Sequence, residues 1–128
     1  MRFLLDTHAL LWWAGGDKRL SSRAASLLAD PVNELLLSAA VVWEISIKAA
    51  LGRLALGGTP DQFTQRAIGS LGMIPRPIRI DHALDVYALP PHHQDPFDRI
   101  LISQARIEGV PLISRDAKLT AYGIPIEW

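Results

Sequence analysis

Short apolar runs alternate with helical patterns along this chain, and this alternation limits its possible folds more than any other feature. The first two runs are RFLLD at residues 2–6 and NELLLSA at 33–39, and the last two are PLIS at 111–114 and IPIEW at 124–128. The stretches between them have the apolar spacing of helices, and Gly or Pro ends most of them. Buried strands that alternate with helices predict an α/β/α sandwich with a mostly parallel central sheet.

The helical patterns cover residues 7–14, 21–30, 40–52, a stretch that starts near Asp61, 81–89, 96–109 and 117–123. A further apolar stretch, MIPRPIRI at residues 73–80, is broken by Pro75 and Pro77. Proline cannot donate a hydrogen bond to a neighbouring strand, so we expect at most an edge strand there.

Length and composition restrict the kind of protein. The 128 residues are 49% hydrophobic, which suits one domain over residues 1–128. The absence of cysteine excludes disulfides and thiolate-bound metals, so any metal would bind oxygen or imidazole ligands. Thirteen basic residues balance thirteen acidic ones, which is unusual for a passive nucleic-acid binder. The sequence shows neither a membrane span nor a signal peptide, and we expect a soluble, cytoplasmic protein.

Four acidic residues stand where a parallel sheet would gather them. Asp6 and Asp116 each come directly after a predicted strand, and the carboxyl ends of parallel strands share one edge of a sheet. Asp98 opens a late helix, and Glu44 lies on a largely apolar helix face, where an unpaired carboxylate is costly. Clustered carboxylates repel each other, so such a site should bind a cation or hold a shared proton.

Each acid also has an ordinary structural explanation. Asp6 and Asp116 are good helix caps, and Glu44 could pair with Lys48 four residues later. In DPFDR, Asp95 could be the N-cap and Asp98 the third-position acid of a capping box. These explanations stay open from the sequence alone.

Taken together, LLDTHALLWW, SAAVVWEISIKAALGRL, HHQDPFDRILISQA and PLISRD resemble a PIN-domain protein, and within that family the VapC-type toxins of prokaryotic toxin–antitoxin pairs. The resemblance covers essentially the whole chain. It implies a PIN-like fold and an endoribonuclease that depends on Mg²⁺ or Mn²⁺. It also implies an RNA substrate, a VapB-like antitoxin that blocks the site, and a homodimer or higher complex.

The same resemblance assigns roles to individual residues. It identifies Asp6, Glu44, Asp98 and Asp116 as the catalytic, metal-binding acids. Asp95, Thr7 and Ser114 would support these ligands. The basic residues that flank the acids, Lys48, Arg99 and Arg115, are candidates for binding substrate phosphates.

Other residues and other protein classes are less well defined by the sequence. His92 and His93 precede the DPFDR segment and could reach the site or simply face solvent. Adjacent Trp12 and Trp13 cannot both face one core, so one of them should meet another protein surface. Phosphoaspartate hydrolases also begin with a strand and an aspartate, but they carry a second aspartate where this chain has His8. A PIN-like module that binds RNA or protein without catalysis is the main alternative.

Overall fold

The computed structural model describes all 128 residues. Its elements, in chain order, are β1 Arg2–Leu5, α1 Thr7–Ala14, α2 Ser22–Ala29, β2 Glu34–Ser38, α3 Ala39–Ala50, α4 Pro60–Gly69, β3 Ile74–Arg76, α5 Ile80–Asp85, the 3₁₀ helix η1 Val86–Ala88, α6 Pro96–Glu108, β4 Leu112–Ile113, the 3₁₀ helix η2 Ala117–Tyr122 and β5 Ile126–Glu127. None of the helices combines the length and apolar character that crossing a bilayer requires.

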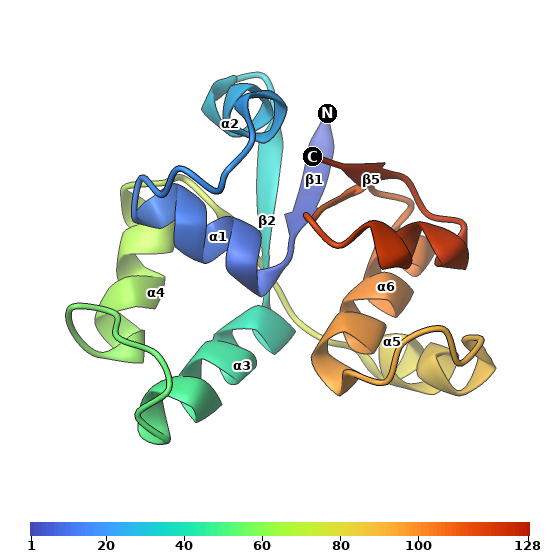
Figure 1. Cartoon of the computed structure of the whole chain (residues 1–128). Coiled ribbons are helices and arrows are strands. Elements are labelled where there is room, and N and C mark those ends of the chain that lie inside the picture. Colours follow the sequence, from blue (N-terminus) through green and yellow to red (C-terminus); the bar gives the residue numbers. More distant parts are fainter.

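All five strands belong to one sheet with the order β3-β2-β1-β4-β5, and every neighbouring pair is parallel. Helices α1 and α4 lie on one side of β1 and β2, and α5 and α6 lie on the other (Figure 1). The predicted α/β sandwich with a parallel sheet is therefore confirmed.

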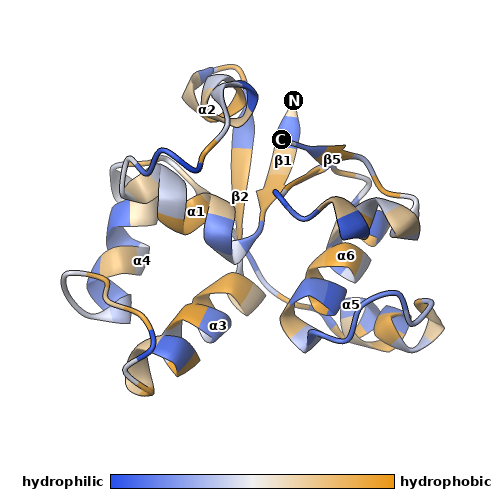
Figure 2. Cartoon of the chain, in the orientation of Figure 1, coloured by the Kyte–Doolittle hydropathy of each residue, from blue (hydrophilic) through white to orange (hydrophobic).

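The central strands are hydrophobic along most of their length (Figure 2). Phe3, Leu4 and Leu5 of β1 and Leu36 of β2 are buried in a continuous apolar cluster that also contains the buried face of α6. Strands covered on both faces need this unbroken apolar character.

Three predicted segments are shorter or less regular in the structure. The MIPRPIRI stretch contributes only β3, which pairs with β2 at the edge of the sheet, where Pro75 leaves no ladder partner unsatisfied. The pattern at 81–89 divides into α5 and η1, and the pattern at 117–123 forms a 3₁₀ helix. Short segments of this kind commonly take the tighter 3₁₀ geometry.

Candidate active site

The chain reverses its direction of travel across the sheet at β1, which lies between β2 and β4. Leu5 and Ile113 are register partners at the ends of β1 and β4, and the Asp6 N–H donates to the Ile113 carbonyl at 3.1 Å. Asp6 and Ser114 therefore leave the sheet side by side. In open parallel sheets, this switch point at the carboxyl ends of the strands is where ligands bind.

Asp6 is the N-cap of α1, as its sequence position suggested, and its Oδ1 accepts the Ala9 N–H at 2.8 Å. Only 7% of the residue is exposed. Burial raises the pKa of the Asp6 carboxyl above its usual range, against the Ser114 hydroxyl and the Ala9 N–H, which lower it. Asp6 is thus a helix cap and, at the same time, a buried acid in which desolvation opposes ionisation.

Glu44 is buried on α3 and lies beside the start of α1. Its Oε1 accepts the Thr7 hydroxyl at 2.5 Å, and its Oε2 accepts the Lys48 Nζ at 2.6 Å. The four-residue pair with Lys48 is therefore real, but it explains only one of the two oxygens. Thr7 satisfies the other, so the carboxylate is fixed in place from two elements.

Asp95 and Asp98 have different roles at the start of α6. Oδ1 of Asp95 caps the helix by accepting the N–H groups of Phe97 and Asp98. The Asp98 carboxylate makes no capping-box bond; its Oδ2 lies 3.2 Å from Nε2 of His93.

The Asp98 carboxyl carries the largest electrostatic perturbation of the site. Burial, assisted by the negative charges of Asp95, Asp6 and Glu44 and opposed by His93, raises its pKa to about 7. Since Asp6 and Glu44 act on Asp98 from two other elements, three of the four predicted acids share one electrostatic site. A group with this pKa holds a proton near neutral pH unless a cation replaces it.

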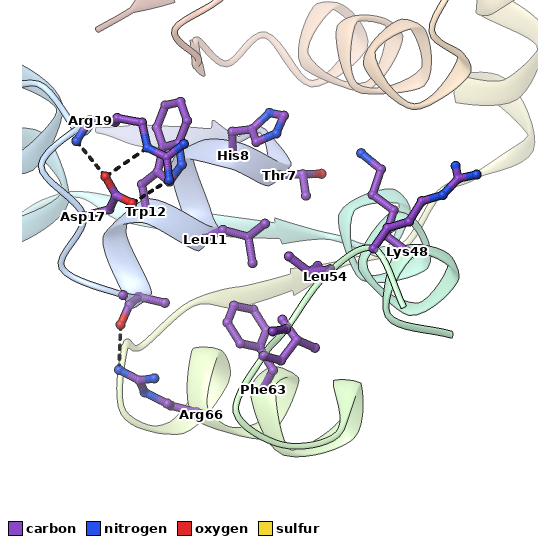
Figure 3. A pocket seen from close by; sticks show the side chains of 15 residues that line it. Thr7, His8, Leu11, Trp12, Asp17, Arg19, Lys48, Leu54, Phe63 and Arg66 are labelled. Atoms are coloured by element: carbon purple, nitrogen blue, oxygen red, sulfur yellow. Dashed lines mark hydrogen bonds and ion pairs between the residues drawn. The ribbon is translucent and has the colours of Figure 1, made fainter. Parts of the chain in front are cut away.

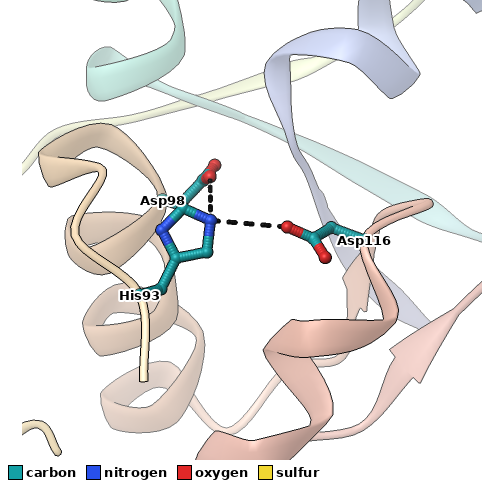
Figure 4. Close-up of side chains that lie close together, drawn as sticks. All are labelled: His93, Asp98 and Asp116. Atoms are coloured by element: carbon teal, nitrogen blue, oxygen red, sulfur yellow. Dashed lines mark ion pairs between the residues drawn. The ribbon is translucent and has the colours of Figure 1, made fainter. Parts of the chain in front are cut away.

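The fourth acid, Asp116, enters the site from η2. It caps that helix by accepting the Lys118 N–H, and its own N–H donates to the Ser114 hydroxyl oxygen at 3.1 Å. Oδ2 of Asp116 lies 3.4 Å from Nε2 of His93 (Figure 4). His93 therefore bridges Asp98 and Asp116.

The two loop histidines, which the sequence could not separate, have different positions. The ligand atoms of His93, Asp98 and Asp116 all lie within 4.8 Å of one another. His92 instead packs edge-on against the Tyr122 ring, with 5.2 Å between ring centroids. The spacing of the histidines contains no signal that distinguishes them, because the course of the loop decides which ring turns inward.

The three basic residues that were predicted to bind phosphate also differ in position. Lys48 is bound to Glu44, and Arg115 lies 5.7 Å from the ring centroid of Trp12 in a small pocket that also contains Asp6 and Asp116. Both cations border the acids and stay available as phosphate ligands.

Arg99 does not border the site in this way. Its guanidinium donates to the carbonyls of Pro90, His93, Val86 and Leu89 and to the Tyr122 hydroxyl. These donors hold the 86–93 loop on α6, which gives the guanidinium a structural role. A guanidinium presents several donors in a fixed plane, which suits this clustering of carbonyls.

Comparisons with known proteins identify the family of the chain. Residues 3–125 match the family model described as the PIN domain. Ribonuclease VapC22 of Mycobacterium tuberculosis (strain ATCC 25618 / H37Rv) is 29% identical over 126 residues, which cover 95% of this chain and 92% of that protein.

Solved structures share the fold. VapBC2 from Rickettsia felis, bound to a DNA fragment from its promoter, matches 99% of this chain and 98% of its own with a TM-score of 0.71 and 12% identity. The Mycobacterium tuberculosis VapC20, described as a sarcin–ricin loop cleaving toxin, matches 95% of both chains with a TM-score of 0.68 and 15% identity. The resemblance to VapC-type proteins is confirmed, and the chain belongs to the PIN-domain family.

Proposed function

We propose that this chain is a metal-dependent endoribonuclease and the toxin of a toxin–antitoxin pair. The observation that carries the proposal is the convergence of Asp6, Glu44 and Asp98 at one site, where burial, assisted by the neighbouring carboxylates, raises the pKa of Asp98 to about 7. Stability alone gives no reason to gather these charges at the switch point of the sheet. The names of VapC22, a ribonuclease, and VapC20, a sarcin–ricin loop cleaving toxin, support the same activity.

The residues present suit a hard divalent cation. Asp6, Glu44, Asp98 and Asp116 would hold Mg²⁺ or Mn²⁺ through carboxylate oxygens, the ligands that both ions favour. When bound, the cation would offset negative charge on the scissile phosphate and lower the pKa of a water molecule. Attack by water, rather than by the ribose 2′-hydroxyl, would leave a 5′-phosphate and a 3′-hydroxyl.

The neighbouring polar groups would keep the acids in place during the reaction. Thr7 donates to Glu44, and Ser114 accepts the Asp116 N–H while its hydroxyl favours the ionised form of Asp6. Asp95 fixes the start of α6 and adds charge beside Asp98. Partners of this kind orient the ligands of a metal site and tune their affinity.

The substrate of the proposed reaction is RNA. Lys48 pairs with Glu44, and Arg115 lines the small pocket that contains Asp6 and Asp116. Both would bind phosphates next to the scissile one without displacing a metal.

Two protein partners complete the proposal. A VapB-like antitoxin would block the site; the structures from Rickettsia felis and Klebsiella pneumoniae, the latter titled a toxin–antitoxin complex, support this. A homodimer would cover the apolar groove that Trp43, Ile78, Val86 and Ile100 line beside α3, α5 and α6. Trp43 is exposed there, and apolar grooves of this kind often mark protein contacts.

Cleavage of total RNA by the purified chain, freed of any bound partner, tests the nuclease. The assay compares Mg²⁺ or Mn²⁺ with EDTA, and the wild-type chain with Asp6→Asn and Asp98→Asn. Asp30→Asn is the matched control, because Asp30 lies at the C-cap of α2, outside the acid cluster. We expect metal-dependent cuts from the wild type and the control and none from the two site variants.

Two results would reject parts of the proposal. Cyclic or 3′-phosphate ends would exclude water as the nucleophile. If the wild type, Asp6→Asn and Asp98→Asn stay folded and bind RNA equally but never cut it, the chain is instead a non-catalytic RNA-binding module.

A further inference from the structure

A second pocket lies directly beside the acids. It is lined by 15 residues, whereas the small pocket that contains Asp6 and Asp116 is lined by 5. Its volume is about 390 Å³, within the range of ligand sites, and its walls come from α1, the 53–56 segment and α4. Leu11, Leu54 and Phe63 meet in its middle, and Arg19, Lys48 and Arg66 lie on three sides of them (Figure 3). We call it the α1–α4 pocket.

The charge around this apolar centre is mainly positive. Four of the lining residues are basic and only one, Asp17, is acidic. Arg19 donates hydrogen bonds to both carboxylate oxygens of Asp17, so this negative charge is already paired. The Arg53 side chain has no hydrogen-bond or ion-pair partner in the chain, and the Arg66 side chain donates only to the Ala14 carbonyl. The pocket therefore suits a ligand with an apolar, flat part and negative charges around it.

The α1–α4 pocket and the acid site share a wall. Thr7 and Lys48, which both bind Glu44, also line the pocket. His8 and Trp12 line this pocket as well as the small one that contains Asp6 and Asp116. A strand that crosses the acids would reach the pocket without leaving the protein surface.

From these observations we propose that the α1–α4 pocket is a subsite for one nucleotide of the RNA strand next to the scissile phosphate. Its base lies against Phe63, and its phosphates meet Arg53 and Lys48. The inference rests on the proposed function and extends it, because it assigns residues that select how the strand is held. Phe63 is the base platform, since guanidinium groups already lie over the Trp12 ring at 4.9 and 5.7 Å.

Binding without cleavage tests the subsite. In an Asp98→Asn background with Mg²⁺, the affinity for a short fluorescein-labelled single-stranded RNA is measured by anisotropy over a range of salt concentrations. The variants are Phe63→Leu, which keeps an apolar side chain, and Arg53→Gln, which removes an exposed charge. Arg79→Gln is the matched control, because Arg79 is exposed at the N-cap of α5 and does not line the pocket. Circular dichroism checks that each variant is folded.

We expect Phe63→Leu to weaken RNA binding roughly tenfold, as the loss of one stacked base does. Arg53→Gln should weaken binding and lower the slope of log affinity against log salt by about 0.7, the value for one single-strand phosphate contact. Arg79→Gln should match the parent. Inorganic polyphosphate, which has no bases, should respond to Arg53→Gln and not to Phe63→Leu.

The outcomes separate this inference from the nuclease itself. If wild-type chain cuts RNA but Phe63→Leu and Arg53→Gln bind it as the parent does, the pocket is not a nucleotide subsite, and a protein segment becomes its candidate occupant. If the wild type neither binds nor cuts RNA, the proposed nuclease function is rejected, and the subsite is rejected with it.

Discussion

Nε2 of His93 lies 3.2 Å from Oδ2 of Asp98, while Nδ1 of the same ring accepts the Asp95 N–H at 3.0 Å. In a neutral imidazole, the nitrogen that accepts a hydrogen bond has no hydrogen, so the other one carries it. Nε2 of His93 is therefore a donor directed at Asp98 and Asp116. This tautomer makes His93 a residue that orients the acids, and it leaves no free lone pair on Nε2 for a metal.

A pair of His93 variants tests this assignment. Gln can place an N–H near the position of Nε2, whereas Asn reaches only the position of Nδ1. We expect His93→Gln to keep Mn²⁺ affinity within a few-fold of wild type and His93→Asn to lose at least about tenfold, as for other groups that orient metal ligands. Calorimetry measures the affinities, and ¹⁵N spectra of the ring report the tautomer. Equal, large losses in both variants would instead indicate that the ring itself binds the metal.

Thr7 is expected to stabilise the metal-free chain through Glu44. Thr7→Val keeps the shape but removes the 2.5 Å hydrogen bond, leaving one oxygen of a buried carboxylate without its partner. The free energy of unfolding should fall by about 1–3 kcal/mol in urea titrations, and Thr7→Ser should recover most of it. An unchanged midpoint in Thr7→Val would mean that Lys48 alone satisfies Glu44.

Arg99 should matter for folding and not for phosphate binding. Arg99→Gln removes a guanidinium with five acceptors, four of them carbonyls of the 86–93 loop. We expect a loss of about 2 kcal/mol in unfolding free energy, since several part-buried carbonyls lose their charged donor at once. Arg99→Lys should not rescue it, because a point charge cannot reach all the acceptors. Normal stability combined with weaker RNA binding would restore the phosphate role.

Much of the fold follows from local patterns. The apolar runs that become β1 and β2 need burial on both faces, and Pro75 restricts β3 to an edge, so the layers and the parallel sheet are predictable. The exact division of 81–89 into α5 and η1 is not, because short segments of either helix type have the same apolar spacing.

The site is predictable to a similar degree. The strand-end rule brings Asp6 and Asp116 to one edge, and the apolar face around Glu44 marks an unusual carboxylate. The positions of His93 and Arg99 depend on the path of the 90–95 loop, which long-range contacts fix. No periodicity encodes that path, so the inward histidine and the structural arginine emerge only from the folded chain.

The raised pKa of Asp98 predicts that the metal-free chain loses stability as pH rises. The folded chain keeps a proton on Asp98 up to about pH 7, whereas the unfolded chain releases it near the usual 3.8. Stability from this proton is complete below pH 3.8 and lost as pH passes 7, a change of at most a few kcal/mol because the side chain is one-quarter exposed. Asp98→Asn cannot ionise, so its stability relative to wild type should grow between about pH 4 and pH 7 and change little above that.

Adding a divalent cation should remove that loss. Mg²⁺ or Mn²⁺ binds the ionised carboxylates and competes with the proton on Asp98. The gain in melting temperature on adding the cation should therefore be small near about pH 5 and large near about pH 8. Thermal melts of the wild type and Asp98→Asn, each with the cation and with EDTA, measure both effects. A cation-induced shift that does not change with pH, or one that Asp98→Asn retains in full, would show that the ion binds elsewhere on the chain.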